Sequence, residues 1–317
     1  MIPATRVLCP IDFSPPALRA LRTAVGLAAL AHAPVHVMTV LEDPYQYVGV
    51  SPPTDEELER TRQALRDAVT AELPAHAAWL PEVEVSVWTG APQEGVLRAA
   101  VETGADLIVM GTHGRSGFGK WLFGSTTERV LRTPPCPVLA VGRGERDLVA
   151  LGPDGPQVTM ERLLVATDFG RDSLRATAFA QSLVAAGGGE LMVAHVMPRL
   201  SPLLTPADVS VAVEYEAEAT AAAESKLAET LAAISQVRSS SWLLHGSPHV
   251  ELLALAEQKD VDLIVMGAVG RGSLHHSLTG LTTYRVISHA PCAVLVLPST
   301  HQVESARLLS REYALGL

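Results

Sequence analysis

The chain of 317 residues is long enough for two domains, and its apolar share of 48% can fill a sizeable core. Its net charge of −10, with no basic stripe, excludes a general nucleic-acid binder. Because no apolar run reaches the roughly 18 residues of a membrane span, and the chain starts without a signal-peptide pattern, we expect a cytoplasmic protein with no membrane partner.

In the first half of the chain, short apolar runs alternate with segments of helical spacing. The expected strands are residues 6–11, 35–41, 83–88, 106–110 and 137–141, and the expected helices are residues 15–32, 54–78, 92–102 and 125–133. Thr54 is expected to cap the second helix, with Glu57 three residues later. Uniformly apolar strands that alternate with helices are typical of a mostly parallel sheet covered on both faces. Right-handed crossovers make such a sheet doubly wound, so the expected fold class is α/β.

The loop that leaves the first strand contains Pro10, Ile11 and Asp12. In an open parallel sheet, ligands bind beyond the carboxyl ends of the strands where the strand order reverses. This loop and the loop that follows residues 106–110 could flank such a point. Asp12 is therefore interpreted as a ligand contact, with the cap of the following helix as the alternative.

A glycine-rich loop joins the strand at 106–110 to the helix at 125–133. Gly111, Gly114, Gly124 and Ser125 give it the pattern G-x2-G-x9-G-S. Glycines let the backbone approach an anion, and the free N–H groups at a helix start attract negative charge. The loop has neither the Lys of a GxxxxGK[ST] loop nor a GxGxxG spacing. The pattern favours phosphate binding, and a purely structural turn is the alternative.

The second half of the chain repeats the first at a constant offset of 156 residues. RVLCPIDFSPPALRA from Arg6 matches RLLVATDFGRDSLRA from Arg162, and DLIVMG occurs at Asp106 and again at Asp262. TGAP and PPCPVLAV match HGSP and APCAVLVL at the same offset. Agreement over four separate blocks predicts two tandem copies of one five-stranded domain.

The repeat sets the expected domain organisation. The first copy covers residues 1–141 and the second covers 161–298. Residues 142–160 match nothing and are rich in Gly, Pro and charge, which indicates a linker. Residues 299–317 form a tail, in which 303–317 fit an amphipathic helix. Its apolar side would carry Val303, Leu308, Leu309, Tyr313 and Leu315. This helix could dock on its own domain, which we favour, or contact another subunit.

The last strand of each copy is apolar and would be an exposed sheet edge. The blocks quoted above resemble the universal stress protein family, whose single-domain members commonly dimerise through this strand. Together with the apolar edges, this resemblance implies that residues 137–141 and 293–297 lie side by side and antiparallel, as an internal pseudo-twofold pair. Cys136 and Cys292 would then lie at opposite ends of the seam, too far apart for a disulfide. These two residues and Cys9 are expected to be small buried hydrophobes in a reducing compartment.

No metal site is expected. The three cysteines form no CxxC pair or Cys/His cluster. His245 and His249 are four residues apart, a spacing that would suit a metal only on a helix. Gly246 and Pro248 favour a turn that enters a helix instead.

Together these blocks resemble the universal stress protein family in its tandem form, over nearly the whole chain except the linker and the tail. In that family the G-x2-G-x9-G-[ST] loop is the signature for ATP or another adenine nucleotide. The resemblance implies first-strand contacts to adenosine, a second-strand residue beside adenine, and loop residues around ribose and phosphates. These residues are Pro10, Ile11, Asp12, Val40, Met110, Gly111, His113, Gly114, Gly124, Ser125, Thr126 and Thr127.

The second copy carries a degenerate form of the same loop. Its glycines keep their spacing, but Leu281 stands where the signature has a hydroxyl residue, and Val269 and Gly170 replace His113 and Ser14. We expect a second site that is weaker or empty. It would use Thr167, Asp168, Val196, Met266, Gly267, Gly270, Gly280, Thr282 and Thr283.

The function these patterns predict is a nucleotide-binding stress or regulatory protein. ATP, with or without Mg²⁺, is the expected ligand, and a homodimer is an open possibility. One alternative is a slow ATPase, although the sequence shows no nucleophile–base set and we expect no catalytic residues. The other is a binder of a different small or apolar ligand, if the glycine loops are only structural.

Overall fold

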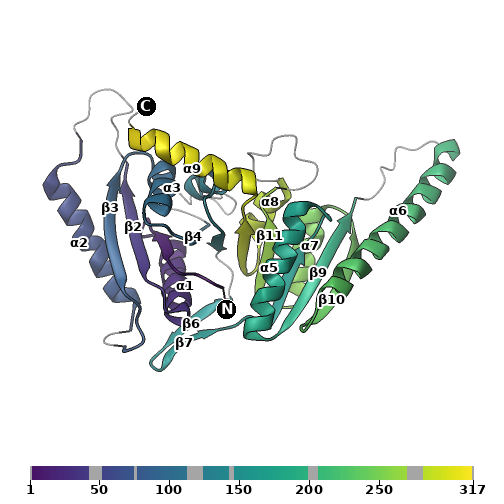
Figure 1. Cartoon of the computed structure of the whole chain (residues 1–317), viewed down its shortest axis with the longest axis horizontal. Helices are drawn as coiled ribbons and strands as arrows, with labels where there is room; N and C mark the ends of the chain where they lie inside the picture. The colour runs from purple at the N-terminus through teal and green to yellow at the C-terminus, as the bar shows by residue number, and fades with distance from the viewer. Residues whose placement is uncertain are drawn as a thin grey trace.

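In the computed structural model, the described parts of the chain are residues 2–42, 52–74, 77–112, 124–142, 146–198, 206–269 and 281–315. They form two α/β halves that share one ten-stranded sheet, with helices on both faces (Figure 1). The predicted α/β fold is confirmed. Within these ranges, no helix is both long and apolar enough to span a membrane.

The N-terminal half is a doubly wound domain. Its elements are β1 (Val7–Pro10), α1 (Pro15–Ala31), β2 (Val35–Leu41), α2 (Asp55–Glu72), β3 (Val83–Thr89), α3 (Pro92–Glu102), β4 (Leu107–Gly111), α4 (Ser125–Arg132) and β5 (Val138–Val141). The strands are parallel, in the order β3-β2-β1-β4-β5. The order reverses between β1 and β4, as expected from the positions of the two candidate loops.

The C-terminal half repeats this arrangement. Its elements are β8 (Arg162–Ala166), α5 (Arg171–Gly187), β9 (Glu190–Met197), α6 (Pro206–Ala233), β10 (Arg238–His245), α7 (Pro248–Gln258), β11 (Leu263–Gly267), α8 (Leu281–His289) and β12 (Ala293–Leu297). The strand order is again β10-β9-β8-β11-β12 with the reversal between β8 and β11. Pro248 starts α7 with Ser247 as N-cap, which confirms the predicted turn between His245 and the helix.

The second helix begins as predicted and ends early. Thr54 and Glu57 form the expected capping box at the start of α2. The helix stops at Glu72 instead of residue 78. The reason is Pro74, because the residue before a proline is pushed away from the helical conformation. Leu73 is accordingly extended, with φ −108° and ψ 146°.

The two halves meet at an antiparallel pair of strands, which confirms the predicted seam. In the register of β5 and β12, Leu139 lies opposite Leu295, and both side chains are fully buried. Cys136 and Cys292 lie beyond opposite ends of this register, and both are free and buried. Burial raises the pKa of each thiol to about 12, so neither is poised to react near neutral pH.

The segment predicted as a linker contains an ordered hairpin. Its strands are β6 (Val149–Gly152) and β7 (Gly155–Val158), and it packs against α1. A Cβ on Gly26 of α1 would lie 2.3 Å from the Cγ1 of Val149, so this glycine allows the close approach. The hairpin therefore belongs to the surface of the N-terminal half.

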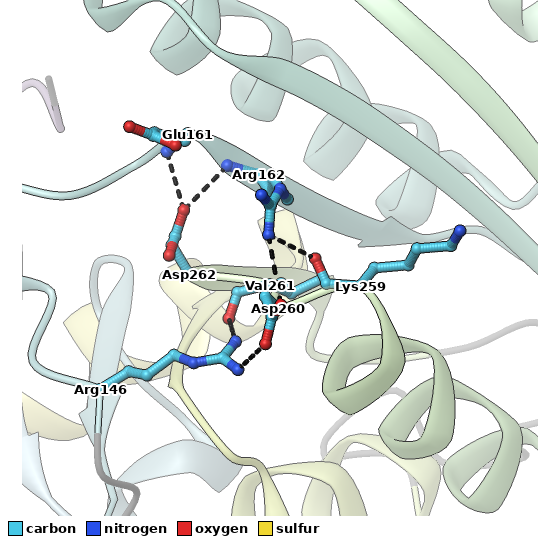
Figure 2. A network of polar contacts seen from close by, with 7 residues as sticks. All are labelled: Arg146, Glu161, Arg162, Lys259, Asp260, Val261 and Asp262. Atoms are coloured by element: carbon cyan, nitrogen blue, oxygen red, sulfur yellow. Dashed lines mark hydrogen bonds and ion pairs between the residues drawn. The ribbon is translucent and has the colours of Figure 1, made fainter.

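Two adjacent linker residues, Arg146 and Asp147, contact different halves of the chain. The Asp147 carboxylate forms a salt bridge with Arg19 of α1 at 2.7 Å. In the opposite direction, Arg146 pairs with the Asp260 carboxylate and donates to the Val261 carbonyl at 3.2 Å (Figure 2). Together, these two residues connect the N-terminal half to the C-terminal half.

The C-terminal helix does not pack where the sequence analysis predicted. Helix α9 (Thr300–Leu315) follows β12, yet it packs against α3 of the N-terminal half (Figure 1). The prediction that it docks on its own domain is therefore wrong. The predicted apolar side also fails at Leu308, whose side chain is 61% exposed. An amphipathic spacing predicts that a helix packs, but it does not identify the surface on which it packs.

Candidate functional site

The carboxyl ends of β1 and β4 lie side by side at the strand-order reversal, and Asp12 stands just past β1. The Asp12 side chain is partly exposed, and its Oδ1 accepts the backbone N–H of Ser14 at 3.0 Å and the Ser14 hydroxyl at 2.5 Å. Ser14, and not Asp12, is the N-cap of α1. The alternative interpretation of Asp12 as a helix cap is thus wrong, and Ser14 fixes the direction of its carboxylate.

Between these two residues the backbone is left-handed. Phe13 has φ 64°, and Phe169 at the equivalent place in the second copy has φ 60°. A residue with a side chain is strained there by about 1–3 kcal/mol, and such strain gathers at functional sites. The sequence contains no signal for it, because phenylalanine is an ordinary strand residue.

The two ends of the glycine loop are held together by hydrogen bonds. The Gly124 N–H donates to the Thr112 carbonyl at 2.8 Å, and the Thr127 hydroxyl donates to the Gly111 carbonyl at 2.8 Å. These bonds place the start of α4 directly beside the end of β4. The predicted contacts His113 and Gly114 lie in between, outside the described residues.

At the start of helix α4, the first N–H groups precede the helical hydrogen bonds. Its first intrahelical bond runs from the Glu128 N–H to the Gly124 carbonyl at 3.0 Å, so the N–H groups of residues 125–127 come before the helical pattern. Among the described residues, no side chain caps this end. Ser125 is exposed and Thr126 is partly exposed. Backbone N–H groups at such a helix start can donate hydrogen bonds to an anion.

Several predicted contacts are already used by the fold. The Met110 and Ile11 side chains are about 4% exposed and belong to the two core clusters. Gly111 is needed for packing, because a Cβ there would lie 2.9 Å from backbone atoms of Pro16 and Ala17 at the start of α1. Ile11, Met110 and Gly111 can therefore contact a ligand only through their backbone atoms. The same holds for Thr127, because its hydroxyl donates to the Gly111 carbonyl.

The remaining predicted contacts of the first strands are partly exposed. Pro10 is the last residue of β1 and pairs with Met38 of β2. Val40, near the end of β2, lies on the α3 side of the sheet, where Gly95 leaves room for its methyl groups. Both residues therefore lie on the rim of the site.

In the second copy, the aspartate is held by a hydroxyl from a different place in the sequence. The Asp168 Oδ1 accepts the Gly170 N–H at 2.8 Å and the Ser173 hydroxyl at 2.6 Å. Ser173 stands where the first copy has Ala17, and Gly170 stands where it has Ser14. The Asp168 carboxylate thus keeps a serine partner despite the change from Ser14 to Gly170, and the weaker second site stays a prediction.

The second copy also places a histidine behind its aspartate. The Nδ1 of His195 in β9 lies 2.7 Å from the Thr167 carbonyl, and its ring lies 4.4 Å from that of Phe169. The Lys226 ammonium of α6 lies 5.8 Å from the centre of the Phe169 ring. The first copy has a buried threonine at the equivalent of His195. The two sites therefore differ in chemistry beyond their glycine loops.

The start of α8 in the second copy carries leucine at the position equivalent to Ser125. Leu281, the first residue of α8, is 71% exposed. The hydroxyl of Thr283 donates to the Gly267 carbonyl at 3.1 Å, which repeats the bond made by Thr127. Thr167, Met266 and Val269 are buried, whereas Val196 and Thr282 are partly exposed. Gly270 and Gly280 lie outside the described residues.

The two α4-type helices are close to each other across the seam. Burial, followed by the Glu128 carboxylate of α4, raises the pKa of Tyr284 in α8. In α7, burial, followed by electrostatic interaction with Arg285 and His289, lowers the pKa of His249. In the described parts of the chain, no group of three or more His, Cys, Asp or Glu residues could hold a metal ion.

Comparison with known proteins identifies the fold. The family model of the universal stress protein family matches residues 3–142 and again residues 159–298. The chain belongs to the universal stress protein family. The two matches agree with the internal repeat and with the two halves of the sheet.

Individual relatives support this membership. A universal stress protein of Thermus aquaticus is 35% identical over 135 residues, which is 43% of this chain and 96% of the relative. One from Methanocaldococcus jannaschii is 29% identical over 144 residues, or 45% of this chain and 84% of the relative. The crystal structure of a universal stress protein from Archaeoglobus fulgidus matches 92% of this chain and 95% of its own, with a TM-score of 0.62 and 24% identity. That structure shares the tandem fold.

Proposed function

We propose that the N-terminal half binds an adenine nucleotide, ATP with or without Mg²⁺, as a stress-response or regulatory protein of the cytoplasm. The observation that carries the proposal is the start of α4, which no side chain of the described residues caps and which the bonds of Gly124 and Thr127 hold beside the β1–β4 reversal. Free N–H groups and the helix dipole stabilise negative charge at that point. The overall charge of −10 makes such a local arrangement necessary for an anionic ligand.

The residues present fit both ends of a nucleotide. At one end, the N–H groups of residues 125–127 and the Ser125 hydroxyl are donors for phosphate oxygens. At the other end, the Asp12 carboxylate can accept a hydrogen bond from a ribose hydroxyl or an amino group. Ser14 keeps this carboxylate in one orientation.

We propose that the second half binds a nucleotide more weakly or not at all. Leu281 offers no hydroxyl at the start of α8, and a lost hydrogen bond to a charged group weakens binding by roughly 1.5–3 kcal/mol. The retained bonds of Asp168 and Thr283 keep the rest of the arrangement. Unequal halves suit a regulatory role in which nucleotide binding to the first half changes the conformation or contacts of the second half.

The direct test replaces Ser125 by glutamate. A carboxylate in the first turn stabilises the helix dipole, so the Ser125→Glu variant is expected to fold. It repels phosphate at the proposed site. We expect the affinity for a non-hydrolysable ATP analogue to fall at least tenfold, about 1.4 kcal/mol.

Leu281→Glu is the matched control, because it places the same charge at the equivalent position of α8. It is expected to leave the tight site unchanged. Unchanged affinity in a folded Ser125→Glu protein would contradict the proposal, as would an equal loss in Leu281→Glu.

A further inference from the structure

The start of α9 is buried between the two halves. Ser299 and Gln302 form a capping box, in which the Ser299 N–H donates to the Gln302 Oε1 at 2.9 Å and the Gln302 N–H donates to the Ser299 hydroxyl at 3.2 Å. The Gln302 side chain has no exposed surface, and Ala306, one turn later, is also buried. This part of the tail is therefore a fixed part of the fold.

The amide of Gln302 reaches across to the N-terminal half. Its Nε2 donates to the Arg132 carbonyl at 2.9 Å and lies 3.5 Å from the Leu131 carbonyl, both in the last turn of α4. The last carbonyls of a helix have no intrahelical partner. Gln302 therefore caps the carboxyl end of α4 from the other half of the chain. A buried amide with these bonds has one stable orientation.

Helix α4 thus connects two features. Its amino end carries the proposed phosphate site, and its carboxyl end is held by Gln302. The helix has eight residues, which corresponds to a length of about 12 Å. So short a helix moves as one rigid body, and α3, which packs on it, also contacts α9.

A linker residue, Arg146, makes a second contact between the halves, in the opposite direction. Arg146 also crosses the seam, but it holds Asp260 and Val261 in the turn before β11 (Figure 2). Those residues are not part of α8. The helix-end contact is therefore directed at the half with the complete glycine loop.

We propose that Gln302 is a positioning residue for the nucleotide site, and that α9 couples this site to the C-terminal half. The inference rests on the proposed function. Docking of α9 favours the position of α4 that binds phosphate, and bound nucleotide in turn strengthens the docking of α9. Thermodynamic linkage requires the two effects to be equal in size.

The test combines hydrogen exchange with titration, on the full chain stripped of nucleotide. In the wild type, a non-hydrolysable ATP analogue is expected to slow amide exchange in residues 300–306. Gln302→Leu, which keeps the volume and removes the bonds, is expected to lower analogue affinity by 5- to 20-fold, within the range typical of coupled sites. Arg146→Leu removes a comparable cross-seam contact and is expected to change affinity less than twofold.

The outcomes separate this inference from the proposed function. If the analogue does not bind the wild type, both are overturned. If it binds while exchange in residues 300–306 is unchanged, only the coupling is overturned. A folded Gln302→Leu protein with wild-type affinity would also overturn it. Should this variant not fold, the exchange measurement on the wild type decides, because a purely structural role of Gln302 would not respond to nucleotide.

Discussion

The two halves of the chain have the same kind of buried residue at the seam, but different residues at the starts of α4 and α8. At the seam, Leu139 and Leu295 face each other in the same buried environment. At the helix starts, Ser125 of α4 corresponds to Leu281 of α8, and both are exposed. An exposed leucine contributes little to packing, so the fold does not require a particular side chain at this position. The serine of the first copy is therefore not explained by packing.

The aspartate ends of the two copies give the opposite result. Asp12 and Asp168 each accept a serine hydroxyl, but the serines stand three residues apart in the aligned copies. One turn of helix returns a side chain to the same face, so Ser173 reaches the position served by Ser14. The copies thus agree at the aspartate and diverge at the phosphate end.

The largest expected effect is on stability at the seam, where the halves should behave alike. Leu139→Ala and Leu295→Ala each remove a fully buried side chain and leave a cavity. Each is expected to lower the free energy of unfolding by about 2–5 kcal/mol. Urea unfolding of both variants measures this loss. Two losses that differ by more than about 2 kcal/mol would show that the seam is not symmetric.

The glycines that end β4 and β11 are expected to differ. At Gly111 a new Cβ would lie 2.9 Å from backbone atoms of α1, whereas at Gly267 the nearest atom would be 3.1 Å away. Gly111→Ala is expected to destabilise the protein by about 1–3 kcal/mol, as overpacking does, and Gly267→Ala by less. Thermal unfolding of the pair provides the measurement. A larger loss in Gly267→Ala would contradict the packing argument.

These glycines illustrate what could be predicted from the sequence. Apolar runs of strand length and the repeated DLIVMG blocks were enough to predict the sheet and the strand-order reversal at β1 and β4. The antiparallel seam also needed the resemblance to a family that dimerises through its last strand. The reason for Gly111 was missed, because its close neighbour is the start of α1, nearly one hundred residues earlier in the chain.

The β6–β7 hairpin was missed although Pro153, Asp154 and Gly155 are a local turn signal for it.

Other features depend on contacts between distant segments. No local pattern shows that Gln302 caps α4, because that contact joins residues 170 positions apart. The serine that bonds the aspartate is also not apparent from the repeat, because Ser14 and Ser173 occupy different positions in the two copies.

A gain of function would sharpen the comparison at the phosphate end. Leu281→Ser restores the hydroxyl at the start of α8. We expect affinity at the second site to rise about tenfold, or about 1.4 kcal/mol, since the bonds of Asp168 and Thr283 are already in place. Titration of the Ser125→Glu/Leu281→Ser double variant isolates the second site. If this variant binds the analogue no better than Ser125→Glu alone, the loss at Leu281 does not explain the inequality.

The smallest expected effect concerns the relocated hydroxyl. Ser14→Ala removes the cap of α1 and is expected to lower stability by about 1 kcal/mol. Ser173→Ala removes the bond to Asp168 and is expected to lower it by about 0.5–1.5 kcal/mol. Adding Gly170→Ser to Ser173→Ala recreates the arrangement of the first copy and should recover at least half of that loss. Chemical unfolding of the set measures it, and no recovery would mean that the two serines are not equivalent.

The central claim is that the chain holds one tight nucleotide site, in its N-terminal half. Calorimetric titration of nucleotide-stripped protein with a non-hydrolysable ATP analogue tests it most directly. The account predicts one tight site per chain, and a second that is at least tenfold weaker or not measurable. Two equal tight sites would contradict the proposed inequality of the halves, and no binding at all would contradict the proposed function.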